Sequence, residues 1–302
     1  MWLPENQLAM VAGMTSALGT IGAMLGDNVI VAWVSHSDWQ HAMNVTGIFG
    51  ILLAVVIYFG ITDHPKHVFT GPESESLQKK FQDLRMIITN KQIWINGFYG
   101  CMVYLPTTVF AELWGIPYLR HAHHLSEPQA AFANSLLFFG FMIGAPTMGA
   151  ISDKIRLRKL PMIVGASGAA VLMCIILYVP SLSLSQLNLC IFCLGLFYSA
   201  QTIVFAVGRE LSPAKAAGTA IALTNMIVMI GAMVLQPLVG RLLDLSLRFH
   251  HAGDIPQGTN LHQVHWLYSA ADYRLAMSII PLGILCAILA TFFIRETHAK
   301  PQ

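Results

Sequence analysis

Two carboxylates lie inside long apolar stretches of this chain. Asp27 lies in the apolar run 8–34, and Glu112 lies near the end of the run 93–116. A charge in the hydrocarbon core of a bilayer is costly, so acids there tend to mark ion or proton pathways. Asp27 is therefore a candidate proton-coupling group or cation partner, with helix packing or a place at the outer mouth as the alternative. Glu112 is a second proton-coupling candidate, with an acid at the membrane surface as the alternative.

Two other groups of residues, one of Cys and one of His, have spacings that could bind a metal or respond to redox state or pH. Cys190-x-x-Cys193 has the spacing of a redox or metal pair, but it lies in an apolar run without a nearby His or acid, which favours simple packing. His121-x-His123-His124 could bind a metal or titrate near neutral pH, and solvated loop residues are the alternative we favour. We therefore predict neither a metal site nor a cofactor.

The elements that carry these residues are apolar and long. Hydrophobic residues make up 55% of the chain and charged residues 11%, whereas soluble domains carry about 25% charged residues. A bilayer-spanning helix needs about 20 apolar residues, and barrel strands are shorter. The composition therefore predicts an all-α membrane protein. Eight runs have the required length, at 8–34, 42–61, 93–116, 130–151, 160–180, 186–208, 216–243 and 273–294.

The basic residues divide unequally between the two sides that eight spans create. One side holds Arg120, Arg241, Arg248 and Arg274, and the other holds all remaining Lys and Arg of the 17 in the chain. Because loops rich in Lys and Arg stay in the cytoplasm, we predict that the richer side is cytoplasmic. Both ends of this chain then lie in the cytoplasm.

A duplicated pattern runs through the chain. Pro4 and the segment 21–25 recur as Pro213 and the segment 230–234, and the segment 38–43 resembles 272–277. Hydrophobic spans repeated in this way predict a membrane protein built from two related halves. The polar segment 62–92 separates the first two spans from the other six, and its residues 77–87 have the spacing of an amphipathic helix.

The tract 149–159 resembles the signature Gly-x-x-x-Asp-[Arg/Lys]-x-Gly-[Arg/Lys]-[Arg/Lys] of the major facilitator superfamily. Its matching residues are Gly149, Asp153, Lys154 and Arg158, and Arg156 stands where the family has Gly. Gly149 would allow close helix approach. Asp153 could pair with the basic loop or with a neighbouring helix terminus.

The resemblance implies a fold of twelve spans in two six-helix halves. The eight spans here would be helices five to twelve. Residues 1–61 would then be the last two helices of the N-terminal half, 62–92 the central cytoplasmic linker, and 93–302 the complete C-terminal half. Four preceding helices would be missing from the chain, and a separate N-terminal helix set is a possible partner.

The resemblance also implies where a solute binds, since the family's cavity lies between the halves. By family position, the candidate solute-binding residues are Asn96, Tyr99, Tyr104, Thr107, Thr108, Tyr198, Gln201, Thr224 and Asn225.

We expect a secondary transporter of a small polar solute (an organic anion, sugar derivative, amino acid or small peptide) that works by alternating access and is coupled to protons. Residues 110–119 and 217–220 resemble bacterial members related to sugar-phosphate and organic-anion permeases, and also the lysosomal dipeptide carriers. A bacterial inner-membrane location follows, with lipid and solute as partners and no nucleic acid. The alternative is a non-transporting membrane sensor or an inactive remnant of a truncated transporter gene. An enzyme is not indicated, since neither a His-Glu-x-x-His cluster nor a nucleotide-binding loop is present.

Overall fold

The structure, a computed structural model, describes residues 8–34, 38–60, 77–179, 181–250 and 268–298. All regular structure within these residues is helical, as the composition predicted. The elements are α1 (Leu8–Val34), α2 (Trp39–Gly60), α3 (Leu77–Thr89), α4 (Lys91–Val103), η2 (Pro106–Trp114), α5 (Gly115–Ala122), α6 (Glu127–Ile155), α7 (Lys159–Tyr178), α8 (Leu184–Tyr198), η3 (Ser199–Thr202), α9 (Ile203–Glu210), η4 (Ala214–Ala216), α10 (Ala217–His250), α11 (Ala270–Met277) and α12 (Ile279–Thr291).

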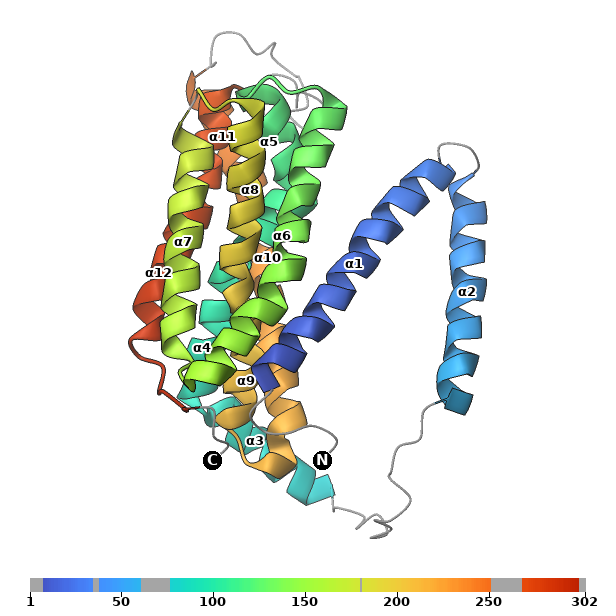
Figure 1. The fold of residues 1–302 in the computed structure, drawn as a ribbon, viewed down its shortest axis with the longest axis vertical. Helices are drawn as coiled ribbons and strands as arrows, with labels where there is room; N and C mark the ends of the chain where they lie inside the picture. The colour runs from blue at the N-terminus through green and yellow to red at the C-terminus, as the bar shows by residue number, and fades with distance from the viewer. Residues whose placement is uncertain (1–7, 35–37, 61–76, 180, 251–267, 299–302) are drawn as a thin grey trace. The chain divides into compact units, whose positions relative to one another are not determined.

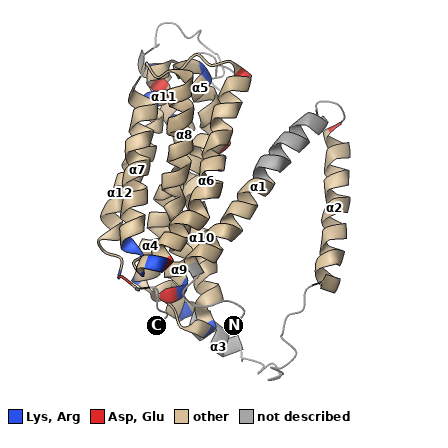
Figure 2. Cartoon of the chain, in the orientation of Figure 1, with Lys and Arg blue, Asp and Glu red and all other residues tan. Residues whose placement is uncertain are grey.

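The chain forms two compact units. The smaller unit is Ile21–Asp83, and it includes α2. Large apolar side chains of α2, such as Phe49, Tyr58 and Phe59, are at least 66% exposed. Figure 2 shows that the described part of α2 is almost without charge. A helix that is apolar all round and exposed suits contact with lipid.

The larger unit is Met1–Thr20 with Leu84–Gln302. In it, helices α4, α6, α7, α8, α10 and α12 run side by side (Figure 1). Figure 2 shows that the charged residues gather at the helix ends, with most of the basic ones near the start of α4 and the end of α9. We call this the basic end of the bundle, marked by Lys91, Arg158, Lys159, Arg209 and Arg295.

Six helices of the described residues are long and apolar enough to cross a membrane. They are Trp39–Gly60, Glu127–Ile155, Lys159–Tyr178, Leu184–Glu210, Ala214–Phe249 and Ala270–Thr291. Two further predicted spans take other forms. Ala9–Gly22 is a shorter apolar helix, and residues 91–122 divide into α4, η2 and α5. The count of eight spans remains a prediction.

Close packing between α6 and α8 depends on two glycines. A Cβ on Gly140 would lie 2.1 Å from the carbonyl oxygen of Phe192, and one on Gly195 would lie 2.3 Å from that of Leu137. Both distances are well inside van der Waals contact, so the two helix backbones meet only because side chains are absent there.

Two helices depart from α geometry near their middles. The segment η2 is a π-helix that begins at Pro106, whose ring removes a backbone donor. The short η3 is a 3₁₀-helix between α8 and α9. Such irregular turns often occur at functional positions in helices.

Candidate functional site

A buried ionic cluster lies where α6, α7 and α9 meet. The Arg158 side chain is 1% exposed, and its Nη1 donates to Asp153 Oδ1 at 2.7 Å. Its Nε donates to both Glu210 carboxylate oxygens at 3.1 and 3.2 Å, and Glu210 is fully buried. Burial alone would lower the pKa of Arg158, but its bonds to Glu210 and Asp153 raise the pKa above the ordinary value. The guanidinium therefore stays charged between two acids.

The same cluster binds the first helix and the end of the chain. Asp153 Oδ2 accepts from the backbone N–H of Met10 in α1 at 3.0 Å. A Cβ on Gly149 would lie 2.3 Å from the Ala9 carbonyl oxygen, so α1 and α6 are in close contact. Thr297 donates to Glu210. Three of the four signature residues thus hold helices together, whereas Lys154 is exposed.

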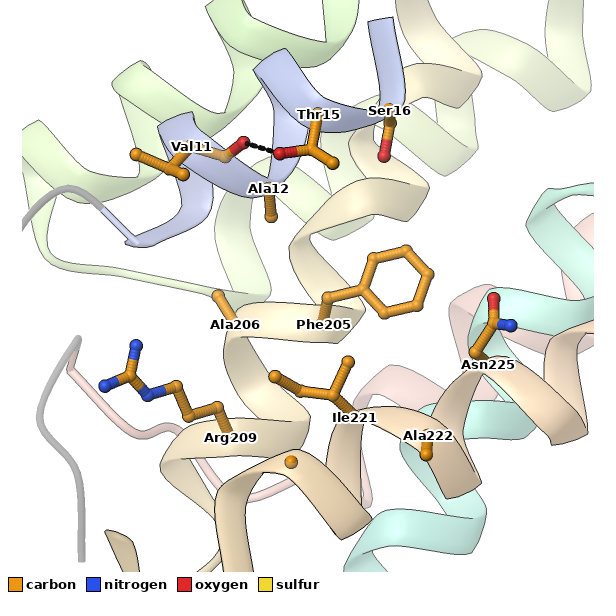
Figure 3. Close-up of a pocket in the computed structure, with 11 residues that line it drawn as sticks. Val11, Ala12, Thr15, Ser16, Phe205, Ala206, Arg209, Ile221, Ala222 and Asn225 are labelled. Carbon is orange, nitrogen blue, oxygen red and sulfur yellow. Dashed lines mark hydrogen bonds between the residues drawn. The ribbon is translucent and has the colours of Figure 1, made fainter. Parts of the chain in front are cut away.

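A pocket of about 600 Å³ lies beside this cluster, between α1, α9 and α10. Figure 3 shows side chains of α1 on one side and those of α9 and α10 on the other. The walls are mainly apolar, and the polar side chains among them are Thr15, Ser16, Arg209 and Asn225. An apolar cavity with a few polar groups is the usual form of a small-molecule site. A guanidinium in such a cavity suits a carboxylate or phosphate.

A second polar group lies on η2, α8 and α10. The Thr107 hydroxyl donates to Tyr198 Oη at 2.7 Å, and Tyr198 stacks on Phe141 at 5.1 Å. Gln236 donates from Nε2 to the Thr108 carbonyl at 2.5 Å and to Glu112 Oε2 at 3.3 Å. We call these residues the mid-helix cluster.

The pocket and the mid-helix cluster occupy two levels of the same helices. Arg209 follows Tyr198 by 11 residues along α8 to α9, and Gln236 follows Asn225 by 11 residues along α10. Eleven residues correspond to about 16 Å of helix. The two sites therefore lie about 16 Å apart, along helices that contribute to both.

The predicted solute-binding residues do not come together at one place. Asn225 lines the pocket, and Thr107, Thr108 and Tyr198 belong to the mid-helix cluster, near Tyr104, whose ring lies 6.4 Å from that of Tyr198.

Four others are buried among helices. Tyr99 donates to the Met162 carbonyl at 2.8 Å, Asn96 donates to the Val204 carbonyl at 2.8 Å, and Gln201 and Thr224 are almost fully buried. The hydrogen bonds of Tyr99 and Asn96 join neighbouring helices.

The structure describes the side chain of Glu112 but not that of Asp27. Glu112 is exposed and accepts from Gln236. Asp27 belongs to the helix α1, but its side chain lies outside the described residues, so its role stays a prediction.

Arg209 was not among the predicted site residues. The sequence placed it in a basic loop after the run 186–208, whereas α9 continues to Glu210 and carries Arg209 into the pocket wall. The available signal was that Arg209 follows the apolar run without a turn residue between them.

The long apolar helices and their exposed apolar faces define a polytopic α-helical membrane protein. The sequence matches the Major Facilitator Superfamily over residues 1–236 and again over 113–302. The chain therefore belongs to this superfamily.

Curated relatives with this resemblance include two transporters of phosphorylated solutes. A "Probable hexose phosphate transport protein" of Chlamydia pneumoniae is 25% identical over 273 residues, which cover 81% of this chain and 60% of that protein. A "Glycerol-3-phosphate transporter" of Bacillus subtilis (strain 168) is 26% identical over 172 residues, 56% of this chain and 38% of that protein. The chain thus spans less than two thirds of the length of either relative.

A solved structure shares the fold. It is a bacterial homolog to the human lysosomal transporter Spinster, in an inward-facing and unoccupied conformation. It aligns with 95% of this chain and 67% of its own, with a TM-score of 0.52 and 18% identity.

Proposed function

We propose that the protein is a secondary transporter of a small organic anion, such as a phosphate ester, and that it works by alternating access. The observation that carries this proposal is the pocket in which Arg209 and Asn225 lie among apolar walls. Hexose phosphate and glycerol-3-phosphate, the solutes named for its relatives, are anions that a guanidinium can bind through two parallel hydrogen bonds.

In this proposal the chain supplies helices five to twelve of a twelve-helix fold. The solute binds at the pocket and passes along the helices that also carry the mid-helix cluster. Irregular turns in η2 and η3 would absorb the backbone changes of opening and closing.

The test is uptake by the full chain reconstituted in liposomes, with radiolabelled glycerol 3-phosphate compared with glycerol. We expect uptake of the anion and not of glycerol. Arg209→Gln should reduce the apparent affinity for the anion about 10- to 100-fold, because a hydrogen bond to a charged group is worth about 1.5–3 kcal/mol. Arg209→Lys should be intermediate.

Arg241→Gln is the matched control, since Arg241 is exposed on the same helix as Asn225, away from the pocket. An equal loss in both variants would contradict a role for Arg209 in anion binding. Absence of uptake for every anion would favour the non-transporting alternative.

Proton coupling is proposed on Asp27 and Glu112. Uptake would be measured with and without an inward pH gradient in Asp27→Asn and in Glu112→Gln. We expect that neutralising the coupling residue removes the acceleration of uptake by the pH gradient. The same variant should still exchange labelled for unlabelled solute. Unchanged acceleration in both variants would remove both acids from the mechanism.

A further inference from the structure

An apolar groove lies on the surface of the helix bundle between α4 and α12. None of its residues lines the pocket that contains Arg209. Its volume is about 540 Å³, and its walls are formed by Trp94, Ile95, Phe98, Cys286, Leu289, Ala290 and Phe293. Trp94 and Phe98 are about 42% and 41% exposed, and Phe293 is 71% exposed. A groove of this shape and polarity, on the exposed surface of a membrane protein, can receive an acyl chain.

The groove ends at the basic end of the bundle. Gln92 joins the two helices there, because its Nε2 donates to the Phe293 carbonyl at 3.1 Å and its Oε1 accepts from the Arg295 N–H at 2.7 Å. Lys91 precedes Gln92, so Lys91 and Arg295 both adjoin the groove end, and both side chains are exposed. The nearby acid Glu296 accepts from the backbone N–H groups of residues 158 and 159 at 2.8 and 3.0 Å. Its carboxylate is therefore already engaged.

Trp94 fixes the depth of this junction. Its indole Nε1 donates to the Ile88 carbonyl at the end of α3 at 2.7 Å. An indole with its ring in an apolar groove and its N–H bonded at the polar end is typical of the membrane–water interface. Phe98, Cys286 and Leu289 thus lie on the bilayer side of Trp94, and Lys91 and Arg295 lie on the headgroup side.

We propose that this groove is a binding site for an anionic phospholipid. One acyl chain lies against Phe98, Leu289 and Phe293, and the headgroup phosphate lies between Lys91 and Arg295. Basic side chains beside an apolar groove at a helix end are suited to this ligand, since they add attraction for negative headgroups. The site does not depend on what the protein transports.

Trp94 provides the probe. The full chain would be reconstituted in nanodiscs that contain increasing fractions of brominated phosphatidylglycerol or brominated phosphatidylcholine, since bromine quenches a tryptophan that it touches. The Trp94 contribution is the quenching lost in Trp94→Phe. We expect half-maximal Trp94 quenching at a mole fraction roughly fivefold or more lower for the anionic lipid, the scale expected for one or two basic side chains beside a headgroup.

Two double variants separate the site from general charge. Lys91→Gln/Arg295→Gln should bring the two lipids to equal quenching, with Trp94 still quenched by both. Arg241→Gln/Arg248→Gln has the same change in charge, on exposed residues of another helix, and should keep the preference. Ala290→Phe, which fills the groove, should reduce Trp94 quenching by both lipids.

The proposal is overturned if the unsubstituted protein shows equal quenching by the two lipids. It is also overturned if the preference survives in Lys91→Gln/Arg295→Gln, or is lost to the same extent in both double variants.

Discussion

At the scale of single residues, Arg158 carries the most consequential contacts. Its guanidinium separates the carboxylates of Asp153 and Glu210 in a place where water has almost no access. Removal of one partner from a buried ion pair leaves the others without compensation, which costs more than the pair contributes. The cluster is therefore fragile to single substitutions, although it holds the helices together.

Arg158→Gln should lower the free energy of unfolding by about 3–5 kcal/mol. The measurement is thermal unfolding in detergent, with Arg156→Gln as the control. Arg156 is exposed and lies in the same loop, so its replacement should change stability by less than about 0.5 kcal/mol. Equal effects of the two variants would show that the cluster does not stabilise the fold.

His123 should make stability depend on pH. Burial lowers its pKa below the ordinary 6.5, and Arg274 and His124 lower it further, against a hydrogen bond to the Ile176 carbonyl that raises it. The folded protein thus favours the neutral ring, and the unfolded chain binds a proton more readily. This contribution is complete above about pH 6.5 and is lost as the pH falls below that value.

His123→Gln should therefore lessen the loss of melting temperature between pH 7.5 and pH 5. His298→Gln is the control, because His298 is exposed and is not among the groups that shift the pKa of His123. An unchanged pH dependence in His123→Gln would exclude His123 as the cause.

At the scale of helices, the contact of α6 with α8 depends on Gly140. Gly140→Ala would place a methyl group against the backbone of α8, so the helices must separate. We expect a loss of about 1–3 kcal/mol, the usual cost of overpacking. The melting temperature in detergent is the measurement.

Gly47→Ala is the matched control for this substitution. A Cβ on Gly47 of α2 would meet nothing within 4 Å. Alanine there should stabilise the helix by about 0.5–1 kcal/mol, because it restricts the unfolded chain. Similar destabilisation by both variants would contradict the account of α6 and α8.

The helices could be predicted from apolar runs, but their interruptions could not. An apolar run indicates that a segment is buried in lipid or protein, whatever its number of residues per turn. The π-helix from Pro106 to Trp114 therefore left no signal except the proline. The extension of α10 to His250, beyond the predicted end at residue 243, also escaped prediction. Polar residues at its end are tolerated by a helix that leaves the membrane.

The solute-binding residues were harder to predict than the helices. Residue type and family position selected Asn225, which lines the pocket. They also selected Tyr99, whose hydroxyl donates a hydrogen bond to a carbonyl inside the bundle. Orientation around the helix axis decides between these outcomes, and it depends on which helices pack together. Arg209 was missed because its helix extends two residues beyond the predicted run 186–208, to Glu210.

At the scale of the whole molecule, the distribution of basic residues predicts orientation. Cysteines introduced at Ser181 and Ala214 test it, because both residues are exposed and they lie on the two predicted sides, Ser181 between α7 and α8 and Ala214 at the start of η4. A membrane-impermeant maleimide added to whole cells should label Ser181→Cys. Ala214→Cys should be labelled only after the membrane is permeabilised.

The unsubstituted protein measures background labelling of the five native cysteines. Labelling of Ala214→Cys in intact cells, with Ser181→Cys protected, would reverse the predicted topology.

The ionic cluster has a consequence for the order in which the protein matures during synthesis. Its members come from residue 10, residues 153 and 158, residue 210 and residues 296–297. Arg158 and Glu210 therefore emerge from the ribosome well before Glu296 and Thr297 exist. The charged end of the bundle cannot complete its hydrogen bonds while the intervening helices are still being inserted. Quality-control proteases that recognise unfinished membrane proteins would find this end of the bundle accessible until residues 296–297 arrive.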